Sequence, residues 1–421
     1  IDPGVTGSHP WLARCQKARP AAEKSGFNPE VCTKTIFRGK MVDVLNYSED
    51  HHRFRQRLRS FIDAEIRPNA MLWEKDRIVP KEAWQKMGQA GFLGTAVSKD
   101  YGGHGLDFLY SVIVSEEMIA SGQTGLAAGL HSDIIVPYIE SFGSETQKKQ
   151  YLPGCVSGDI ITALAMTEPG AGSDVASIET TAVEDGNHVI LNGTKTFISN
   201  GINCDLVVLA AKNPEVEDKH HALSLYLVED GTTGFSRGRH LEKMGMHSQD
   251  TAELFFSDCR IPRENILGSK GGGFMMLMQK LQQERLVSAI SNVAAAEQLL
   301  NQTIEFCKNH TVDGKPLSKK QAVKFTLAEW ATEVKMNRAL LDQVILGHMA
   351  GENVVMETMM IKFASSEMAN QLVSKMMDLY GEYGQLEANE IAQQFRDLRI
   401  ITIFAGTTEI MKTIIAQSLQ L

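Results

Sequence analysis

The first regular pattern along the chain is helical. Between residues 48 and 160, apolar residues recur every three to four positions, which is the spacing of one buried helix face. Ser48 precedes the first of these segments and is expected to cap it, because its hydroxyl can accept a hydrogen bond from a free N–H of the first turn. The predicted helices in this part span 48–66, 80–92 and 107–122, with a glycine-rich loop at 101–105.

The period of the pattern changes from about residue 161. Apolar or β-branched residues now occur in short alternating runs, and Gly-Asn, Asn-Gly and Asp-Gly pairs lie between the runs. Alternation with such turns is typical of antiparallel strands, because successive side chains of a strand point to opposite faces of the sheet. The predicted strands cover 188–192, 205–211, 222–228 and 252–257.

Three consecutive glycines at 271–273 end the strand pattern, and helical periodicity returns after them. The predicted helices are 274–308, 318–350, 353–381, 387–397 and 407–418. No alternation of strands with helices is visible, so a Rossmann-type cofactor site is not expected. The predicted fold class is α+β, with an N-terminal α-helical domain (41–160), a middle antiparallel β domain (161–268) and a C-terminal helical domain (269–421).

Residues 1–40 fit none of these patterns. The segment holds seven Lys or Arg residues against three Asp or Glu residues, together with several prolines and glycines. We interpret it as a vector-derived leader, with the remnant of a basic targeting peptide as the alternative. In either case the segment is left out of the predicted fold.

Composition narrows the class of protein. The chain has 421 residues, of which 43% are hydrophobic and 22% are charged, and its net charge is −9. These values are typical of a globular protein of two or three domains, and the absence of a dense basic cluster argues against nucleic acid as the main partner. No apolar run reaches the ~18 residues that cross a bilayer. The six cysteines lack CxxC spacing, which favours free thiols, and the histidine pairs lack the spacing of metal ligands, so no metal site is predicted.

A carboxylate lies in line with apolar residues of the first helix after the glycines. Leu277, Leu281 and Glu284 follow one another at i, i+4 and i+7, so they share one helix face. A carboxylate on such a face is ion-paired, protonated or used as a base. The ion pair would be with Arg285, or with Lys280 one helical turn earlier. Both interpretations stay open from the spacing alone.

Two segments of the β region suit a flat ligand that carries phosphate. Residues 165–174 read AMTEPGAGSD, in which Thr167 and Ser173 flank a turn rich in Gly and Pro. Hydroxyls can bond the edge of a heterocycle, and glycines let backbone N–H groups approach a phosphate. Residues 192–201 read NGTKTFISNG, in which Phe197 offers a stacking face two residues before a hydroxyl. The alternative is an ordinary strand with a phenylalanine in the core.

These segments resemble the acyl-CoA dehydrogenases, and the resemblance covers about residues 48–418. AMTEPGAGSD is similar to the family's flavin- and pyrophosphate-binding segment almost letter for letter, and KMGMHSQDTAELFF and GGGFMMLMQKLQQER also resemble the family. IFAGTTEIM at 403–411 resembles YEGTxEI, whose glutamate is usually the catalytic base. Here that position is Ala405. The long-chain and isovaleryl types carry the base on the earlier helix in a QERL or LERL context, which matches Glu284.

The resemblance implies both the fold and the reaction. The fold would end in a C-terminal four-helix bundle, and the cofactor would be FAD. An acyl-CoA thioester would be dehydrogenated to the trans-2-enoyl-CoA, with an electron-transferring flavoprotein as acceptor. Glu284 would be the base, and the backbone N–H of Ala405 would bond the thioester carbonyl, since a backbone donor survives the loss of a side chain. A lyase or desulfinase without net oxidation and a non-enzymatic flavin-binding relative are the alternatives.

The same resemblance assigns the remaining site residues. Those expected to contact FAD are Leu164, Met166, Thr167, Gly172, Ser173, Phe197, Ile198, Ser199, His310, Gln321, Asp378, Gly381, Thr407 and Glu409. Those expected to contact the substrate are Ser173, Gln282, Gln283, Arg285 and Gly406.

Two departures from the family pattern concern FAD. The arginine of the family's RxxFG reaches the FAD pyrophosphate of a neighbouring subunit, but His310 stands at that position and Asp313 stands for the phenylalanine. The family's Gly-Gly is Gly381-Glu382 here. The resemblance further implies a homo-oligomer, a tetramer built as a dimer of dimers. It would lie in the cytoplasm of a bacterium, which is favoured, or in the mitochondrial matrix of a eukaryote.

Overall fold

The computed structural model describes residues 44–387 and 389–421, so the segment interpreted as a leader lies outside the described residues. The N-terminal domain is helical, as predicted, and Ser48 caps its first helix by accepting a hydrogen bond from the N–H of His51 at 3.4 Å. The helices are α2 (Glu49–Phe61), α3 (Ala70–Asp76), α4 (Lys81–Gln89), α5 (Phe108–Ala120), α6 (Val136–Phe142) and α7 (Glu145–Ser157), with π-helical stretches η1 (Ile62–Ile66) and η4 (Leu130–Ile135).

The middle of the chain forms one mixed sheet in the order β6-β7-β3-β2-β4-β5-β8, with β1 beside β4. Its strands are β1 (Thr162–Ala165), β2 (Thr181–Asp185), β3 (His188–Ser199), β4 (Leu206–Lys212), β5 (Leu223–Glu229), β6 (Phe235–His240), β7 (Thr251–Pro262) and β8 (Ile266–Leu267), and the short helix α8 (Lys219–Ala222) precedes β5. Most neighbours are antiparallel, as predicted, but β1 and β2 both run parallel to β4. A parallel neighbour needs a crossover, which the β2–β3 hairpin supplies between β1 and β4 and which β3 supplies between β2 and β4.

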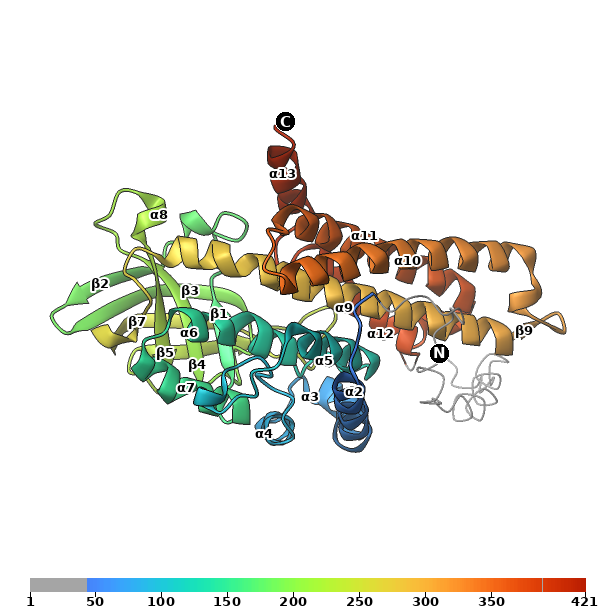
Figure 1. Ribbon diagram of the computed structural model, residues 1–421, viewed down its shortest axis with the longest axis horizontal. Helices are drawn as coiled ribbons and strands as arrows, with labels where there is room; N and C mark the ends of the chain where they lie inside the picture. Colours follow the sequence, from blue (N-terminus) through green and yellow to red (C-terminus); the bar gives the residue numbers. More distant parts are fainter. Residues whose placement is uncertain (1–43, 388) are drawn as a thin grey trace, which may run out of the picture. The chain divides into compact units, whose positions relative to one another are not determined.

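The chain after the sheet is helical, as predicted. The elements are α9 (Gly273–Asn309), a hairpin of β9 (Thr311–Val312) and β10 (Lys315–Pro316), α10 (Gln321–Met349), α11 (Val355–Tyr380), α12 (Glu390–Asp397) and α13 (Thr408–Ser418). α9 packs against α10 and α11, and α11 also packs against α13. Figure 1 shows α9 running from the sheet past α5 to the β9 hairpin.

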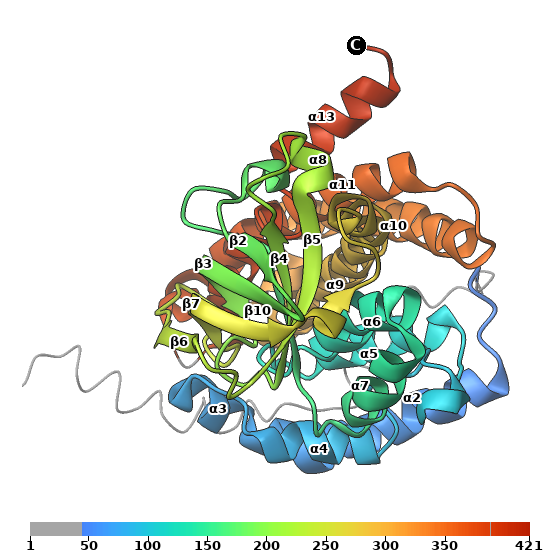
Figure 2. The ribbon, with the colours of Figure 1, turned by 90° about the vertical axis from the view of Figure 1, so that its left-hand side faces the viewer.

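Two apolar cores place α9 at the junction of the three domains. Near its start, Leu277 packs with Tyr138 of α6 and with side chains of β4 and β5. Further along, Ile290 packs with Val112 of α5 and Leu341 of α10. In Figure 2, α9 and α6 lie on the same side of the sheet. The middle turns of α9 are therefore enclosed by all three domains.

Ion pairs join the helical domains beside this junction. Glu116 of α5 accepts a hydrogen bond from Arg55 of α2 at 2.8 Å and another from Arg338 of α10 at 3.0 Å. The side chains of Arg55 and Arg338 are largely buried, with 18% and 11% of their surface exposed. A largely desolvated carboxylate that bridges two arginines is bound more strongly than a pair at the surface, so it fixes α10 against the N-terminal helices.

Candidate active site

Glu284 lies in the middle turns of α9. Its side chain is half-buried, and its Oε2 atom is buried without a hydrogen-bond partner in the described part of the chain. Neither predicted ion pair forms there: the Nζ of Lys280 instead donates to Ser141 Oγ at 2.7 Å, and Arg285 makes no direct contact with the carboxylate. Burial raises the pKa of Glu284 to about 7, although the charges of Arg285 and Lys362 oppose the increase. This is the pKa of a general base that works near neutral pH.

A tight turn before α13 places Ala405 beside α9 and α11. Ala405 and Gly406 both adopt left-handed backbone conformations, with φ of 52° and 88°. The carbonyl of Gly406 accepts a hydrogen bond from the Nζ of Lys362 on α11. A β-carbon at Gly406 would lie 2.7 Å from a methionine side chain of α13 and 3.5 Å from the Nε of Arg285, so only glycine fits. The turn is therefore packed against the residue that follows Glu284.

The backbone N–H of Ala405 is available to a ligand. It donates to no acceptor in the described part of the chain. A left-handed conformation costs a residue other than glycine about 1–3 kcal/mol, and such strain is concentrated at functional sites. A strained residue with a free N–H suits the predicted role of Ala405 as a donor to a carbonyl oxygen.

Other polar atoms near Glu284 are also buried without a partner among the described residues. They are the hydroxyl of Tyr138, the Nε of Arg285 and the Oγ of Ser288. Burial raises the pKa of Tyr138, and the negative charge of Glu284 raises it further. Ser288 lies one helical turn after Glu284. An unpaired buried polar group costs about 1–3 kcal/mol, so several of them together indicate a place where a polar ligand completes the hydrogen bonds.

The two glutamines before Glu284 contact the neighbouring helices. The Nε2 of Gln282 donates to the Oγ1 of Thr358 on α11 at 2.9 Å, and the Nε2 of Gln283 donates to the carbonyl of Asp133 on η4 at 2.6 Å. In this structure the amides of these two predicted substrate residues therefore hold α9 between η4 and α11. Their contacts fix the direction in which the next residue, Glu284, leaves the helix.

The Gly- and Pro-rich segment after β1 folds back onto β3. The carbonyl of Thr167 accepts a hydrogen bond from the N–H of Thr196 at 2.9 Å. The Nζ of Lys195, which is fully buried, donates to the carbonyl of Met166 at 2.9 Å and to Glu168 Oε1 at 2.8 Å. The backbone around Thr167 is thus fixed beside the strand that carries the second predicted flavin segment.

The turn itself leaves room for a ligand. Gly170 and Gly172 would have no neighbour within 4 Å of an added β-carbon. Gly172 and Ser173 are exposed, whereas Leu164 pairs with Val208 in the sheet. An open glycine turn with an exposed hydroxyl suits the approach of a phosphate to the backbone.

Phe197 is an exposed aromatic ring in the middle of a sheet. It lies at an irregularity between Lys195 and Ile198 where the pairing of β3 with β7 shifts, and its φ is 56°. Its exposed fraction is 67%, whereas Ile198 is buried and Ser199 pairs with Thr251. The alternative of a core phenylalanine is therefore wrong. The bulge turns the ring outward, where it can stack on a flat heterocycle, so the residues present fit FAD.

A second set of predicted cofactor residues lies near the far end of α9. The set comprises His310 at the C-cap of α9, Gln321 at the start of α10, and Asp378 and Gly381 at the end of α11. Helical rise puts His310 roughly 40 Å from Glu284 along α9. The His310 ring stacks on Phe306 with centroids 4.8 Å apart and meets Tyr383 edge-on at 5.3 Å. The structure therefore does not bring these residues together with Glu284 in one chain.

The remaining predicted residues lie at the start of α13. Thr407 is its N-cap, with Oγ1 accepting a hydrogen bond from the N–H of Ile410 at 3.2 Å. Glu409 is exposed in the first turn, where a negative charge suits the helix dipole. Both follow directly on the turn that holds Ala405.

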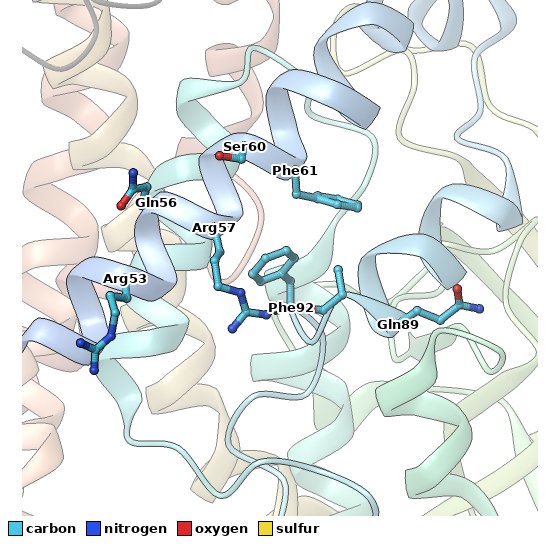
Figure 3. Close-up of a pocket in the computed structure, with 8 residues that line it drawn as sticks. Arg53, Gln56, Arg57, Ser60, Phe61, Gln89 and Phe92 are labelled. Atoms are coloured by element: carbon cyan, nitrogen blue, oxygen red, sulfur yellow. Dashed lines mark hydrogen bonds between the residues drawn. The ribbon is translucent and has the colours of Figure 1, made fainter.

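A well-formed surface depression lies away from the candidate site. A depression of about 670 Å³ lies between α2 and the end of α4, lined by residues such as Arg53, Arg57 and Phe92 (Figure 3). It contains none of the predicted site residues. Across residues 44–387 and 389–421, no group of three or more His, Cys, Asp or Glu side chains is arranged to hold a metal ion, and no helix is long and apolar enough to cross a membrane.

Sequence reasoning missed several residues of the site. Lys362, Tyr138 and the pair of Glu168 with Lys195 were not singled out. The signal for Lys362 was present: Met359, Lys362 and Ser366 lie on one face of the predicted helix, and all three are fully buried. Like Glu284, this lysine is a charged residue on an otherwise apolar helix face.

The chain matches three domain models of one family in the order of its own domains. The N-terminal domain of acyl-CoA dehydrogenase matches residues 48–159, the middle domain matches 163–259 and the C-terminal domain matches 271–420. The matched segments agree with the helical, sheet and helical parts of the structure.

Individual relatives match over most of their length. The chain is 41% identical to the mitochondrial long-chain specific acyl-CoA dehydrogenase of Sus scrofa, over 97% of this chain and 96% of the relative. The crystal structure of an acyl-CoA dehydrogenase from Geobacillus kaustophilus is 50% identical, with a TM-score of 0.88 over 89% of this chain and 99% of that one. A glutaryl-CoA dehydrogenase from Mycobacterium smegmatis, solved with FADH2, is 25% identical, with a TM-score of 0.83 over 90% and 96% of the two chains.

The fold, the two predicted flavin-binding segments and the similar proteins thus all indicate the same family. The family's members are FAD-dependent, and the open turn and exposed Phe197 ring suit that cofactor. This chain belongs to the acyl-CoA dehydrogenase family of flavoprotein oxidoreductases.

Proposed function

We propose that this protein oxidises an acyl-CoA thioester between its α and β carbons, giving the trans-2-enoyl-CoA, with Glu284 as the base. The observation that carries the proposal is a half-buried carboxylate with a buried, unpaired Oε2 and a pKa of about 7, close to a turn whose strained Ala405 has a free N–H. The base thus lies on α9 and not in the turn before α13, as in the long-chain and isovaleryl types that the chain resembles.

The proton transfer needs two groups that act on adjacent atoms of the substrate. An α C–H beside a thioester is weakly acidic, and hydrogen bonds to the carbonyl oxygen stabilise the enolate that forms. The N–H of Ala405 donates to that oxygen, and Glu284 accepts the α proton. A bound acyl chain excludes water from the site, which favours proton transfer to a carboxylate whose pKa is already raised.

Bound FAD would supply the redox chemistry, as the acceptor of the hydride from the β carbon. Residues of this chain that would hold it are Thr167, Ser173 and Ser199 as hydrogen-bonding groups, with Phe197 as the stacking face. Lys195 and Glu168 would keep the segment around Thr167 in place. Electron-transferring flavoprotein is proposed as the acceptor, on the resemblance to the family.

Assembly is part of the proposal. His310 and its neighbours lie roughly 40 Å along α9 from Glu284, so they would serve the FAD of a neighbouring subunit. This separation supports a homo-oligomer, and the resemblance to the family favours a tetramer built as a dimer of dimers. A bacterial cytoplasm is the favoured location, and the mitochondrial matrix is proposed if the source is a eukaryote.

The proposal is tested by mixing the FAD-loaded protein anaerobically with a panel of saturated, branched and long acyl-CoA thioesters. At least one should bleach the flavin absorbance in a single turnover and yield a trans-2-enoyl-CoA by mass spectrometry. A product formed with the flavin still oxidised would indicate the lyase or desulfinase alternative. No bleaching and no product across the panel, by a protein that retains FAD, would favour a non-enzymatic flavin-binding protein.

A further inference from the structure

Lys362 is a charged side chain in an apolar interior. It lies on α11 with 0% of its surface exposed, and its Nζ donates a hydrogen bond to the carbonyl of Gly406. No carboxylate lies within ion-pair distance of its Nζ in the described part of the chain. Its helix neighbours Ile361 and Ser365 are fully buried as well.

A buried ammonium without a paired carboxylate is unfavourable, because the charge has lost its hydration. Consistent with this, burial and, to a lesser extent, the charge of Arg285 lower the pKa of Lys362 to about 8. An apolar side chain of similar length would fill the same space without the free-energy cost of burying a charge. Folding alone therefore does not account for a lysine at this position.

The charged groups around Lys362 come from three elements. Arg285 and Glu284 on α9, Glu367 on its own helix and Glu409 on α13 are the charges that act on its ammonium group. Of these, Glu367 also accepts a hydrogen bond from the Thr408 hydroxyl at 2.7 Å, which ties the start of α13 to α11. Lys362 thus bonds the turn that holds the carbonyl donor, a turn packed against Arg285 beside the proposed base, and its charge acts on that base.

We propose that Lys362 is a positioning residue with two effects on the reaction. Its hydrogen bond to Gly406 holds the strained turn so that the N–H of Ala405 stays directed to the substrate. Its positive charge stabilises the ionised form of Glu284 and so keeps the base ionised near neutral pH. This inference rests on the proposed function of Glu284.

Three substitutions separate the two effects. Lys362→Gln keeps an N–H donor without the charge, Lys362→Arg keeps the charge, and Lys362→Met removes both. Lys412→Met is the matched control, because Lys412 is an exposed lysine of α13 whose Nζ lies 4.9 Å from the ring of Phe363 on α11.

The main measurement is the pH dependence of kcat/KM for the FAD-loaded proteins. A cation near a carboxylate lowers its pKa, so its removal raises the pKa. In Lys362→Gln, the pH at which kcat/KM falls on the acid side of the profile should increase by about one unit. The value of kcat at high pH should be retained. In Lys362→Met, the acid side of the profile should shift to higher pH by the same amount as in Lys362→Gln. In addition, kcat at high pH should fall about tenfold or more, with KM little changed. Lys362→Arg and Lys412→Met should keep the wild-type profile.

A second measurement does not need turnover. The infrared carbonyl band of protonated Glu284, identified by subtraction of the Glu284→Gln spectrum, reports the titration of this residue directly. Its midpoint should rise in the folded, FAD-loaded Lys362→Gln protein. A midpoint equal to wild type would overturn the electrostatic effect even if no acyl-CoA is oxidised. Unchanged kcat in Lys362→Met would overturn the positioning effect.

Discussion

The pKa of Glu284 leads to a prediction for the free enzyme. A raised pKa of about 7 means that the carboxyl is mostly protonated at lower pH and cannot accept the α proton. The value of kcat/KM should therefore rise with pH and reach half of its plateau near pH 7. The measurement is kcat/KM at constant ionic strength from about pH 5 to about pH 9. A half-maximal value near the ordinary pKa of glutamate would show that the base is exposed, or is another residue.

Site residues whose polarity differs from that of their sequence neighbours could be predicted from the sequence. Residues that only hold the site in place could not. Glu284 stood out because a charge interrupts an apolar face. The free N–H of Ala405 could not be derived from spacing, since φ at an alanine is not visible in the sequence, and only the family resemblance pointed to it. Tyr138 looked like an ordinary core residue, because its unpaired hydroxyl depends on which helix lies opposite.

The buried pair of Lys195 and Glu168 gives a prediction at the scale of an element. Lys195→Met should leave a buried carboxylate and loosen the segment around Thr167 from β3. Removal of one partner of a buried pair costs about 3–5 kcal/mol. Glu168 keeps hydrogen bonds from the N–H groups of Glu179 and Thr180, so the lower end of that range is expected. The measurements are the unfolding free energy of the FAD-free protein and the dissociation constant of FAD.

The control for this prediction is Arg260→Met, which removes an ion pair with Asp185 at the surface of the same sheet. Both partners are about half exposed, and such pairs contribute about 1 kcal/mol or less. Lys195→Met should be clearly less stable than the control and should retain less FAD. If the two variants unfold alike, the buried pair does not hold the segment.

Long helices were predicted to within a few residues, whereas half of the sheet was missed. Many turns of apolar periodicity specify α9, α10 and α11. The strands β1 and β6 carry no comparable signal: β1 reads TALA, too short for a period of two, and β6 reads FSRGRH, which is mostly polar. β1 is a strand because β4 lies beside it, and that contact is not local in the sequence.

At the scale of the whole molecule, His310 leads to a prediction about assembly. His310→Arg should tighten FAD about tenfold, because a charge-assisted contact with a pyrophosphate is worth roughly 1–3 kcal/mol. The aromatic stack with Phe306 can accept a planar guanidinium, so the fold should tolerate the change. The measurement is the FAD retained after dialysis at fixed salt.

The oligomer provides the control for this prediction. The contact would reach FAD only across a subunit boundary, so dilution to the monomer should remove the gain while the protein stays folded. Equal FAD retention by the two proteins at high concentration would mean that residue 310 does not reach the pyrophosphate. A gain that persists in the monomer would contradict the proposed assembly.

The central claim, that Glu284 is the base, is tested most directly by anaerobic single-turnover bleaching of the flavin in Glu284→Gln. Glu305→Gln is the control, because Glu305 lies on the same helix and pairs with Lys308 at the surface. Glu284→Gln should retain FAD and bind acyl-CoA, but its bleaching rate should fall by ~10²–10⁴-fold or more, while Glu305→Gln matches wild type. Bleaching by Glu284→Gln within a few-fold of the wild-type rate would contradict the account.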